Sequence, residues 1–532
     1  MNLLQDKWIN VQRKNGEIEK IAPYQITDTF ETNPIIEIVT PRPDFKGAMY
    51  QFLIGLFQTV CSPPSEEKWQ DWFWEPPHPD ELKKETDRVA FAFDLFGEKI
   101  RFMQDMNLYS ENDEEKFKPI ELLFIEAPDE SKREKNLDFF VKKYQIQNTC
   151  GSCSALALIT LQINAPEGGS GNYTSLRGGG PLTTLLKLDD EKHSLWQNIW
   201  INILSENYTK SKKSTGKNYE YVFPWVTDNY YKFKSHSKTT NQDLHFLSMY
   251  WSNSRRLYLN KLEENGKCDI CSEHSDLLVN TYRAKNQGID YGGGGWIHPL
   301  NPYYFKKDKE LGDTWFPHHP QPGGIVYSNW QSFTYGKKGQ EENAKVIKIY
   351  LEERKEEQLR VWTFGYDMKQ MKSRCWYEST IPIYKIPIDY AVKFEYRISL
   401  IIGASVQVAN NLQKFVKQAW KKEGNTDFLK TSFFKATESS FYNLAKNIRD
   451  NIQKEEPFDN DSKLNWLKYL NKESLKLFDL YVESGSIEFE NIQRIVNARQ
   501  KLISENIGDK MKERIGLHVE KKPKTTKGVK KK

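Results

Sequence analysis

The feature that most restricts the fold is a long proline-free stretch between Pro387 and Pro457. Proline breaks helix interiors, so its absence over this length permits long helices. Apolar residues within and after the stretch recur at spacings of three and four, which is the amphipathic helix pattern. The pattern covers segments 391–420, 434–452, 467–482 and 492–503. Because short links join these segments, we predict an antiparallel four-helix bundle over residues 388–517.

The region upstream, residues 1–387, has a different pattern. The apolar run Ile35–Val39 is typical of a strand, Met49–Val60 is typical of a helix, and 154–163 fits a short buried helix or strand. Residues 272–345 are rich in glycine, proline and histidine, which indicates long loops. We therefore predict an α+β protein, with a large irregular mixed α/β domain followed by the bundle.

The excess of positive charge lies in the last twelve residues, which carry seven lysines and no acid. The chain has a net charge of +5, so the rest of it carries −2. A slightly acidic protein does not bind nucleic acids through its overall charge. Any binding of nucleic acid therefore depends on local basic patches or on the tail. We predict that residues 518–532 form a disordered basic tail that either touches phosphate or aids solubility.

Composition also limits the environment of the protein. The longest apolar candidate, Ile398–Ala409, is interrupted by polar residues and is shorter than the roughly 18–20 residues that cross a bilayer. The N-terminal segment has no basic region followed by an apolar core, so we expect no secretory signal, no membrane partner and a cytoplasmic location. Six cysteines in 532 residues are too few for a disulfide scaffold.

Four of the cysteines form two Cys-x-x-Cys pairs, Cys150/Cys153 and Cys268/Cys271. Two such pairs supply four thiolates, the ligand set of a structural zinc ion. The 114 residues between the pairs far exceed the spacing of a compact zinc ribbon. Two unrelated pairs or a redox site are the alternatives. We predict structural zinc, which would join distant segments and leave no open position for catalysis.

Two glycine-rich runs follow the first pair, at 166–172 and 176–181. They do not form a Walker A loop, because no Gly-Lys-Ser/Thr follows. Glycine lets the backbone approach a ligand closely, so such a loop can enter a groove where side chains would clash. A flexible surface loop is the alternative interpretation.

The segment Gly365–Arg374 predicts a hairpin or turn that carries cations beside two methionines. Cations next to a planar amide and flexible thioethers suit a wedge into stacked bases. An ordinary charged hairpin is the alternative. The histidines show no metal-binding spacing, so we interpret them as surface or structural residues.

Taken together, these motifs resemble the CasA family, the large subunit of the type I-E CRISPR Cascade complex. The resemblance covers the chain to about residue 517 and keeps the family's motif order. It is carried by Met1-Asn-Leu-Leu-x-Asp-x-Trp8, Cys150-Gly-x-Cys153, Ala165-Pro-x-Gly with Ser175-Leu-Arg-Gly-Gly, Gly266-Lys-Cys-x-x-Cys271, Trp296-x-His-Pro299 and the C-terminal helices.

The resemblance implies a non-enzymatic subunit of a CRISPR RNA-guided antiviral complex that binds double-stranded target DNA. Such a subunit reads the protospacer-adjacent motif, helps to open the duplex and stabilise the R-loop, and presents the R-loop to a helicase-nuclease. The implied partners are CRISPR RNA, target DNA, the other Cascade subunits and the helicase-nuclease.

The family's functional residues map onto this sequence at three places. The loop that enters the DNA minor groove corresponds to Gly168, Gly169, Ser170, Gly171 and Asn172, with serine where the family often has glycine. The wedge corresponds to Gln370, flanked by Lys369 and Met371, and the loop that contacts RNA and a neighbouring subunit corresponds to Phe140, Val141 and Lys142.

A minor-groove lysine of the family has no clear counterpart. An ungapped comparison places Asn286 or Gln287 at its position, and we assign the role to the adjacent Lys285. Two other functions remain as alternatives to motif recognition: a zinc- or thiol-dependent hydrolase or nuclease, and a scaffold subunit that does not read DNA.

Overall fold

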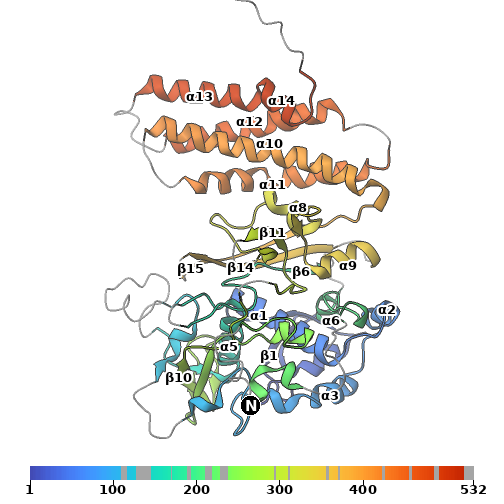
Figure 1. The fold of residues 1–532 in the computed structure, drawn as a ribbon, viewed down its shortest axis with the longest axis vertical. Helices are drawn as coiled ribbons and strands as arrows, with labels where there is room; N and C mark the ends of the chain where they lie inside the picture. The colour runs from blue at the N-terminus through green and yellow to red at the C-terminus, as the bar shows by residue number, and fades with distance from the viewer. Residues whose placement is uncertain are drawn as a thin grey trace, which may run out of the picture. The chain divides into compact units, whose positions relative to one another are not determined.

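The structure, a computed structural model, divides into two units (Figure 1). The mixed unit comprises Met1–Gln321 and Ser332–Ile383, and the helical unit comprises Pro322–Gln331 and Tyr384–Lys532. The described residues are 1–109, 117–127, 145–168, 171–188, 193–209, 219–227, 238–292, 295–308, 312–354, 359–369, 372–421, 426–454, 458–483 and 491–519. The predicted basic tail lies outside them from residue 520 onward.

The mixed unit contains small antiparallel sheets with helices between them. The sheet orders are β2-β1-β3, β4-β10-β5 with β7 also on β10, β12-β11-β13, β15-β14-β6, and the pair β8-β9. The strands are β1 Ile9–Arg13, β2 Ile18–Ile21, β3 Ile35–Ile38, β4 Lys118–Pro119, β5 Thr149–Cys150, β6 Thr183–Leu188, β7 Arg256–Leu262, β8 Gly266–Lys267, β9 His274–Ser275, β10 Leu278–Lys285, β11 Tyr303–Asp308, β12 Gly312–Pro317, β13 Glu341–Glu342, β14 Leu359–Lys369 and β15 Lys372–Pro382.

Helices connect these strands and fill the space between the sheets. They are α1 Pro43–Val60, α2 Glu66–Trp74, α3 Pro79–Asp87, α5 Gly151–Asn164, α6 Leu195–Trp200, α7 Glu206–Thr209, α8 Trp330–Thr334, which spans the boundary of the units, and α9 Lys345–Glu353. The predicted long loop over 272–345 is wrong, because the region contains β9 to β13 and α8. Its strands are short and separated by Gly and Pro, so their alternating pattern is weak in the sequence.

The core of the mixed unit surrounds α1, which is apolar on nearly every side and buried accordingly. The Phe52 ring of α1 packs edge-on against four aromatic rings, those of Trp8, Phe93, Phe102 and Trp251. A Cβ on Gly47 would lie 2.7 Å from the Phe364 ring, so glycine lets α1 approach β14 closely.

The helical unit consists of long helices that pack along one another (Figure 1). Its helices are α10 Ile388–Trp420, α11 Asp427–Asp450, α12 Asn460–Glu483, α13 Ile492–Ile507 and the short α14 Asp509–Arg514. The predicted helical segments lie within these bounds, apart from Ile452 just beyond α11, so a mixed α/β region followed by a helical region is confirmed. Within the described residues, no helix is both long enough and apolar enough to cross a membrane.

A segment far upstream completes the core of the helical unit. The Tyr327 ring stacks on Phe441 of α11 with centroids 4.2 Å apart, and its hydroxyl lies 2.9 Å from Oγ1 of Thr437. No periodicity in the sequence indicates that residues 322–331 belong with the helices, because the segment has a strand-like and turn-like composition.

Buried amides link three of the long helices. Asn506 of α13 accepts a hydrogen bond from Nδ2 of Asn411 on α10 at 3.0 Å and donates to Oγ of Ser474 on α12 at 2.9 Å. Buried polar groups need partners, so this network favours one register of the helices over alternatives that leave the amides unpaired.

Candidate nucleic-acid interface and metal centre

The two Cys-x-x-Cys pairs meet in one cluster within the mixed unit. The sulfur atoms of Cys150, Cys153, Cys268 and Cys271 all lie within 4.8 Å of one another, and those of Cys150 and Cys271 are 3.8 Å apart. A tetrahedral zinc site with Zn–S bonds of roughly 2.3 Å has sulfur–sulfur edges of about 3.8 Å. The cluster therefore fits a metal ion held by four thiolates.

Local structure positions each pair. Cys150 is the N-cap of α5, and its sulfur accepts a hydrogen bond from the backbone N–H of Cys153 at 3.5 Å. The second pair occupies the turn between β8 and β9, closed by a bond of 2.9 Å from the N–H of Cys268 to the carbonyl of Glu273. Strand β10 follows this turn and pairs with β5, which places Leu278 opposite Cys150. Strand pairing thus closes the 114-residue gap.

Hydrogen bonds among the four thiols shift their pKa values in opposite directions, upward for Cys150 and Cys153 and downward for Cys268 and Cys271. A hydrogen bond with Cys153 lowers the pKa of the Cys271 thiol to about 7. Lys20 forms an ion pair with Glu273, which raises the pKa of Lys20, and the nearby thiols of Cys150 and Cys271 add to that increase. A cation beside the cluster stabilises the thiolate form, which is the form that binds metals.

The two segments that flank the predicted glycine loop, which we call its legs, are held by hydrogen bonds from Arg255. Arg255 donates from Nη1 to the carbonyl of Tyr173 at 2.8 Å and from Nη2 to the carbonyl of Pro166. Burial lowers the pKa of Arg255 to about 10. Sequence reasoning missed Arg255, because its partners are backbone carbonyls, which no sequence pattern marks. A freely flexible loop does not describe these legs.

The base of the loop is also closed on itself and bonded to a second segment. The N–H of Gly168 donates to the carbonyl of Asn172 at 2.9 Å, and Gly171 has a φ of +81°. The N–H of Gln287 donates to the carbonyl of Gly171 at 2.8 Å. A Cβ on Gly171 would lie 3.0 Å from Cγ of Gln287, so a larger residue would disturb this contact. Gly169 and Ser170 lie outside the described residues.

The contact with Gln287 brings the loop beside the predicted minor-groove lysine. Lys285 is exposed at the end of β10, opposite Arg256 of β7. Asn286 and Gln287 follow at once, and Gln287 has a φ of +64°. The loop and the segment 285–287 therefore lie side by side, although more than 100 residues separate them in the sequence.

The predicted hairpin is present as β14 and β15. Its last pair joins Lys369 to Lys372, and the register shifts between Asp367 and Met368. Nη2 of Arg374 lies 2.6 Å from Oδ1 of Asp367, whose carboxylate is buried. The ion pair crosses the hairpin at the irregularity and fixes the two strands there. Gln370 and Met371 at the tip lie outside the described residues, as do Phe140, Val141 and Lys142.

The second glycine run, residues 178–180, packs between the glycine loop and the hairpin, and we call this run the seam. A Cβ on Gly179 would lie 2.9 Å from Cα of Pro166, and one on Gly180 would lie 2.9 Å from Cγ of Met368. A Cβ on Gly178 would lie 2.7 Å from the ring of His319. The run is therefore packed on three sides, and glycine is required there for close approach rather than for flexibility.

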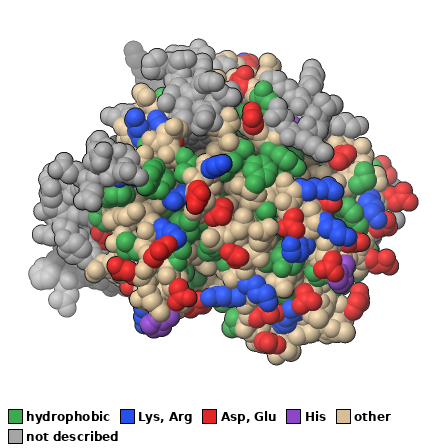
Figure 2. Space-filling view, turned by 90° about the horizontal axis from the view of Figure 1, so that it is seen from below, with side chains coloured by type: hydrophobic (Ala, Val, Ile, Leu, Met, Phe, Trp, Pro, Cys, Tyr) green, Lys and Arg blue, Asp and Glu red, His purple; other side chains and the backbone are tan. Residues whose placement is uncertain are grey.

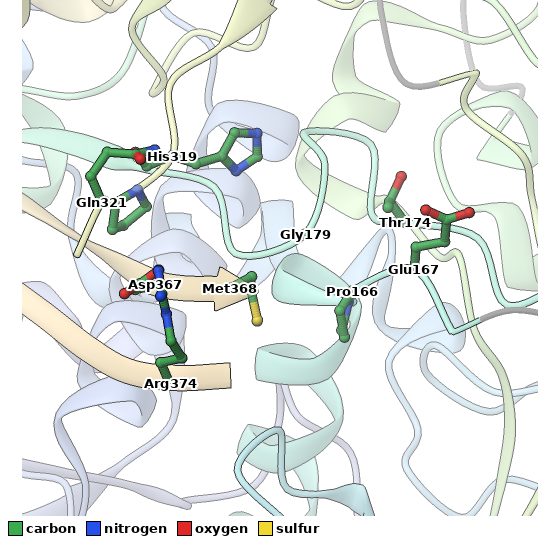
Figure 3. Close-up of a pocket in the computed structure, with 10 residues that line it drawn as sticks. Pro166, Glu167, Thr174, Gly179, His319, Gln321, Asp367, Met368 and Arg374 are labelled. Atoms are coloured by element: carbon green, nitrogen blue, oxygen red, sulfur yellow. The ribbon is translucent and has the colours of Figure 1, made fainter. Parts of the chain in front are cut away.

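A pocket of about 270 Å³ lies beside this seam (Figure 3). One wall comes from the glycine-rich segment, including Pro166 and Glu167, and another from the hairpin, including Asp367, Met368 and Arg374. The pocket thus separates the two elements that the sequence assigns to DNA.

Described histidines have packing and capping contacts. His298 is buried, and its Nδ1 accepts a hydrogen bond from the N–H of Leu300 at 3.1 Å. Burial holds the pKa of His298 well below its usual value, so the ring is neutral. His78 accepts a hydrogen bond from the N–H of Asp80 at the start of α3. These contacts agree with a structural role.

Charge is mixed on the face of the molecule that Figure 2 shows. The face in Figure 2 shows acidic and basic side chains interspersed, without a broad region of one sign. In the helical unit, a groove of about 700 Å³ runs beside α13 and the end of α10. Amide, hydroxyl and cationic side chains line the groove, including Gln418, Arg494 and Lys501.

The model of the family described as CRISPR-associated protein Cse1 matches residues 2–477, nearly the whole chain. The chain belongs to the Cse1 family. The structural resemblance to CasA proteins that the motifs suggested is thereby confirmed.

Solved structures share the Cse1 fold over almost the full length. The chain resembles Thermus thermophilus CasA with a TM-score of 0.67 and 15% identity, covering 95% of this chain and 99% of that one. It resembles Thermobifida fusca Cse1 with a TM-score of 0.68 and 11% identity, covering 97% and 98%. A chain described as part of a CRISPR RNA-guided surveillance complex gives a TM-score of 0.67 and 14% identity, covering 96% and 99%. At sequence identities this low, the likeness to these structures shows that the chain shares their fold.

Proposed function

We propose that this Cse1-family chain is the DNA-recognition subunit of a CRISPR RNA-guided surveillance complex in the cytoplasm. It binds CRISPR RNA and other Cascade subunits, reads the protospacer-adjacent motif of double-stranded target DNA, and helps to recruit a helicase-nuclease. The observation that carries the proposal is the convergence, in the mixed unit, of the glycine loop, the segment 285–287 and the β14–β15 hairpin.

The glycine loop supports recognition through the minor groove. Its legs are fixed by Arg255 and its base is bonded to Gln287, so the glycine backbone is presented from a rigid base. The minor groove distinguishes mainly A·T from G·C pairs, so a backbone-rich loop that enters it reads a short, permissive motif. Lys285 at the end of β10 is the cation that we assign to the same groove.

The hairpin supports opening of the duplex. Its tip carries Lys369, Gln370 and Met371, and the ion pair between Asp367 and Arg374 stiffens its end. Unstacking a base step costs a few kcal/mol, so a wedge needs a firm support. The amide of Gln370 can stack flat against a base, while Lys369 offsets phosphate charge.

The charge distribution supports a protein that does not hold random DNA tightly. Base pairing with the guide reads the target sequence, and the protein reads only the adjacent motif, as in the general RNA-guided case. Phosphate contacts alone carry no sequence information and retain non-target DNA. A chain with interspersed charges and a net charge of −2 without its tail agrees with this division.

The helical unit contributes to the R-loop in this proposal. We assign α10 to α13 to an antiparallel four-helix bundle that steadies the displaced strand or the neighbouring subunits. Its exposed lysines include Lys417, Lys421 and Lys446, and the polar groove beside α13 offers amides and two cations but no carboxylate among its lining residues.

The metal in this proposal is zinc with a structural role. Thiolates are preferred zinc ligands, and four of them complete a tetrahedral site with no position left for a catalytic water. The protein therefore acts by binding rather than by hydrolysis. The alternatives are a zinc- or thiol-dependent hydrolase or nuclease, and a scaffold that does not read DNA.

A gel-shift assay of the reconstituted complex on targets with a randomised flanking motif tests the proposal. The wild-type complex should enrich a short motif, and Gly169→Asp should abolish that enrichment, because it adds bulk and negative charge to the groove-binding loop. Gly16→Asp is the matched control, since Gly16 lies in the exposed β1–β2 turn with a φ of +90° and open space around it. Unchanged motif enrichment by the Gly169→Asp complex would identify a scaffold.

A further inference from the structure

A pocket lies between the glycine-rich segment and the hairpin (Figure 3), and the proposed function does not assign it a role. Its volume of about 270 Å³ lies just below the roughly 300–1,000 Å³ of sites for drug-sized ligands. The space therefore suits a single ring system rather than a length of nucleic-acid chain.

The walls of the pocket are firmly held. The 2.6 Å ion pair between Arg374 and Asp367 fixes the hairpin side. On the opposite side, Gly179 packs closely against Pro166, whose carbonyl accepts a hydrogen bond from Arg255. A site with both walls held in this way is largely formed before any ligand arrives, which reduces the ordering cost of binding.

The lining chemistry argues against a phosphate and for a base. Glu167 and Asp367 contribute two carboxylates, and the guanidinium of Arg374 is already paired with one of them. Phosphate would meet net negative charge there. Flipped-out bases, in contrast, are held between apolar surfaces and read by polar groups at their edges. Pro166 and Met368 supply the apolar surfaces, and Thr174 and Glu167 the polar edge.

Which base the pocket holds follows from how base pairing changes when the DNA duplex opens. When the duplex opens beside the motif, the target-strand base gains a partner in the guide RNA. The displaced-strand base at the first position loses its partner and gains none. We propose that this pocket holds the first unpaired base of the displaced strand, an inference that rests on the proposed function.

The exposed carboxylate of Glu167 gives the pocket a preference. A carboxylate accepts a hydrogen bond from an exocyclic amino group, as in the pairing of Glu with cytosine N4. Cytosine and adenine carry such a group at that edge and thymine does not. The pocket therefore favours cytosine or adenine over thymine at the first displaced position.

The test measures R-loop lifetime in the reconstituted complex with a cycle of protein and DNA changes. Thr174→Trp fills the pocket and should shorten the lifetime severalfold on normal DNA. An abasic site at the first displaced position should shorten it equally for the wild type, and Thr174→Trp should then have no further effect. Equal loss from Thr174→Trp on both DNAs, or indifference of the wild type to the abasic site, would overturn the proposal.

A second variant keeps the test informative if Thr174→Trp misfolds. Glu167 is exposed, so Glu167→Gln should fold normally, and it should remove a roughly fivefold preference for cytosine over thymine. The displaced base alone is varied while the target strand stays constant. Glu31→Gln, at an exposed carboxylate before β3, is the matched control and should keep the preference. A wild-type complex without base preference would also contradict the proposal.

The same measurements separate this inference from the function on which it rests. If the wild type loses the R-loop on DNA with a scrambled flanking motif, motif recognition holds whatever the pocket does. Retained motif dependence without any coupling to the abasic site would reject the pocket alone. Loss of motif dependence would reject the proposed function itself.

Discussion

The mixed unit and the helical unit are built in opposite ways. The cysteine cluster and the proposed DNA interface of the mixed unit join segments more than 100 residues apart, through β5–β10 pairing and the contact between Gly171 and Gln287. The helices of the helical unit follow one another along the chain. The contrast teaches that the candidate sites of the mixed unit depend on contacts between distant chain segments. Bringing such segments together costs chain entropy, which the contacts at the sites must offset.

The largest effect should come from removing a metal ligand. Cys268→Ser should abolish metal binding and the cooperative fold of the mixed unit while the helical unit keeps its helices. Binding at structural zinc sites contributes on the order of 10 kcal/mol, comparable with the total stability of a domain at about 5–15 kcal/mol. Metal analysis and thermal unfolding followed by tryptophan fluorescence and far-ultraviolet circular dichroism check this.

Cys375→Ser is the matched control, because Cys375 is an exposed cysteine outside the cluster. It should leave metal content and unfolding unchanged. A Cys268→Ser protein that unfolds like the wild type without metal would remove the main difference between the two units.

The next effect tests whether the helical unit is as local as its helices suggest. Tyr327→Ala should destabilise that unit by about 3 kcal/mol, because truncating a buried aromatic ring leaves a cavity. Tyr327→Phe keeps the stacking on Phe441 and removes only the hydroxyl, which bonds with Thr437 and Ser405, so it should cost about 1 kcal/mol. Urea unfolding followed by helical dichroism measures both. If Tyr327→Ala has no effect, the helices alone make the unit.

A smaller loss is expected inside the helical unit itself. Asn506→Ala should reduce the free energy of unfolding by about 1–3 kcal/mol, because it removes the acceptor of the buried Nδ2 of Asn411 and the bond to Ser474, whose hydroxyl keeps its bond to the carbonyl of Asn471. Asn497→Ala, at an exposed position of the same helix, should be close to neutral. Equal urea midpoints for the two variants would mean that the amide network does not set the packing.

The last effect is on a rate and not on stability, and it concerns the tip of the hairpin in the mixed unit. Gln370→Ala should slow R-loop formation on fully paired DNA about tenfold, equivalent to roughly 1.4 kcal/mol in the barrier. The rate on DNA whose first pairs are pre-melted should hardly change, because the opening cost is already removed. Stopped-flow kinetics on both substrates decide the point. Equal slowing on the two would make Gln370 a binding contact and not a wedge.

Sequence reasoning succeeded where a pattern was local. The spacing of apolar residues predicted α10 to α13, and the cation-rich segment around Lys369 predicted the β14–β15 hairpin. It failed over 272–345, where short strands between glycines and prolines lacked a visible period. It also missed the clamp by Arg255, because the partners of this side chain are backbone carbonyls that leave no mark in the sequence.

The sequence by itself identified the candidate residues: four cysteines in two Cys-x-x-Cys pairs, a glycine loop, a charged hairpin tip and a set of amphipathic helices. Only the tertiary structure decided which of them act together. It joined the two cysteine pairs, set Gly171 against Gln287, used the run at 178–180 as a packed seam, and added Tyr327 to the helices. The physical reason is that strand pairing and side-chain packing act between surfaces, whatever the separation of those surfaces along the chain.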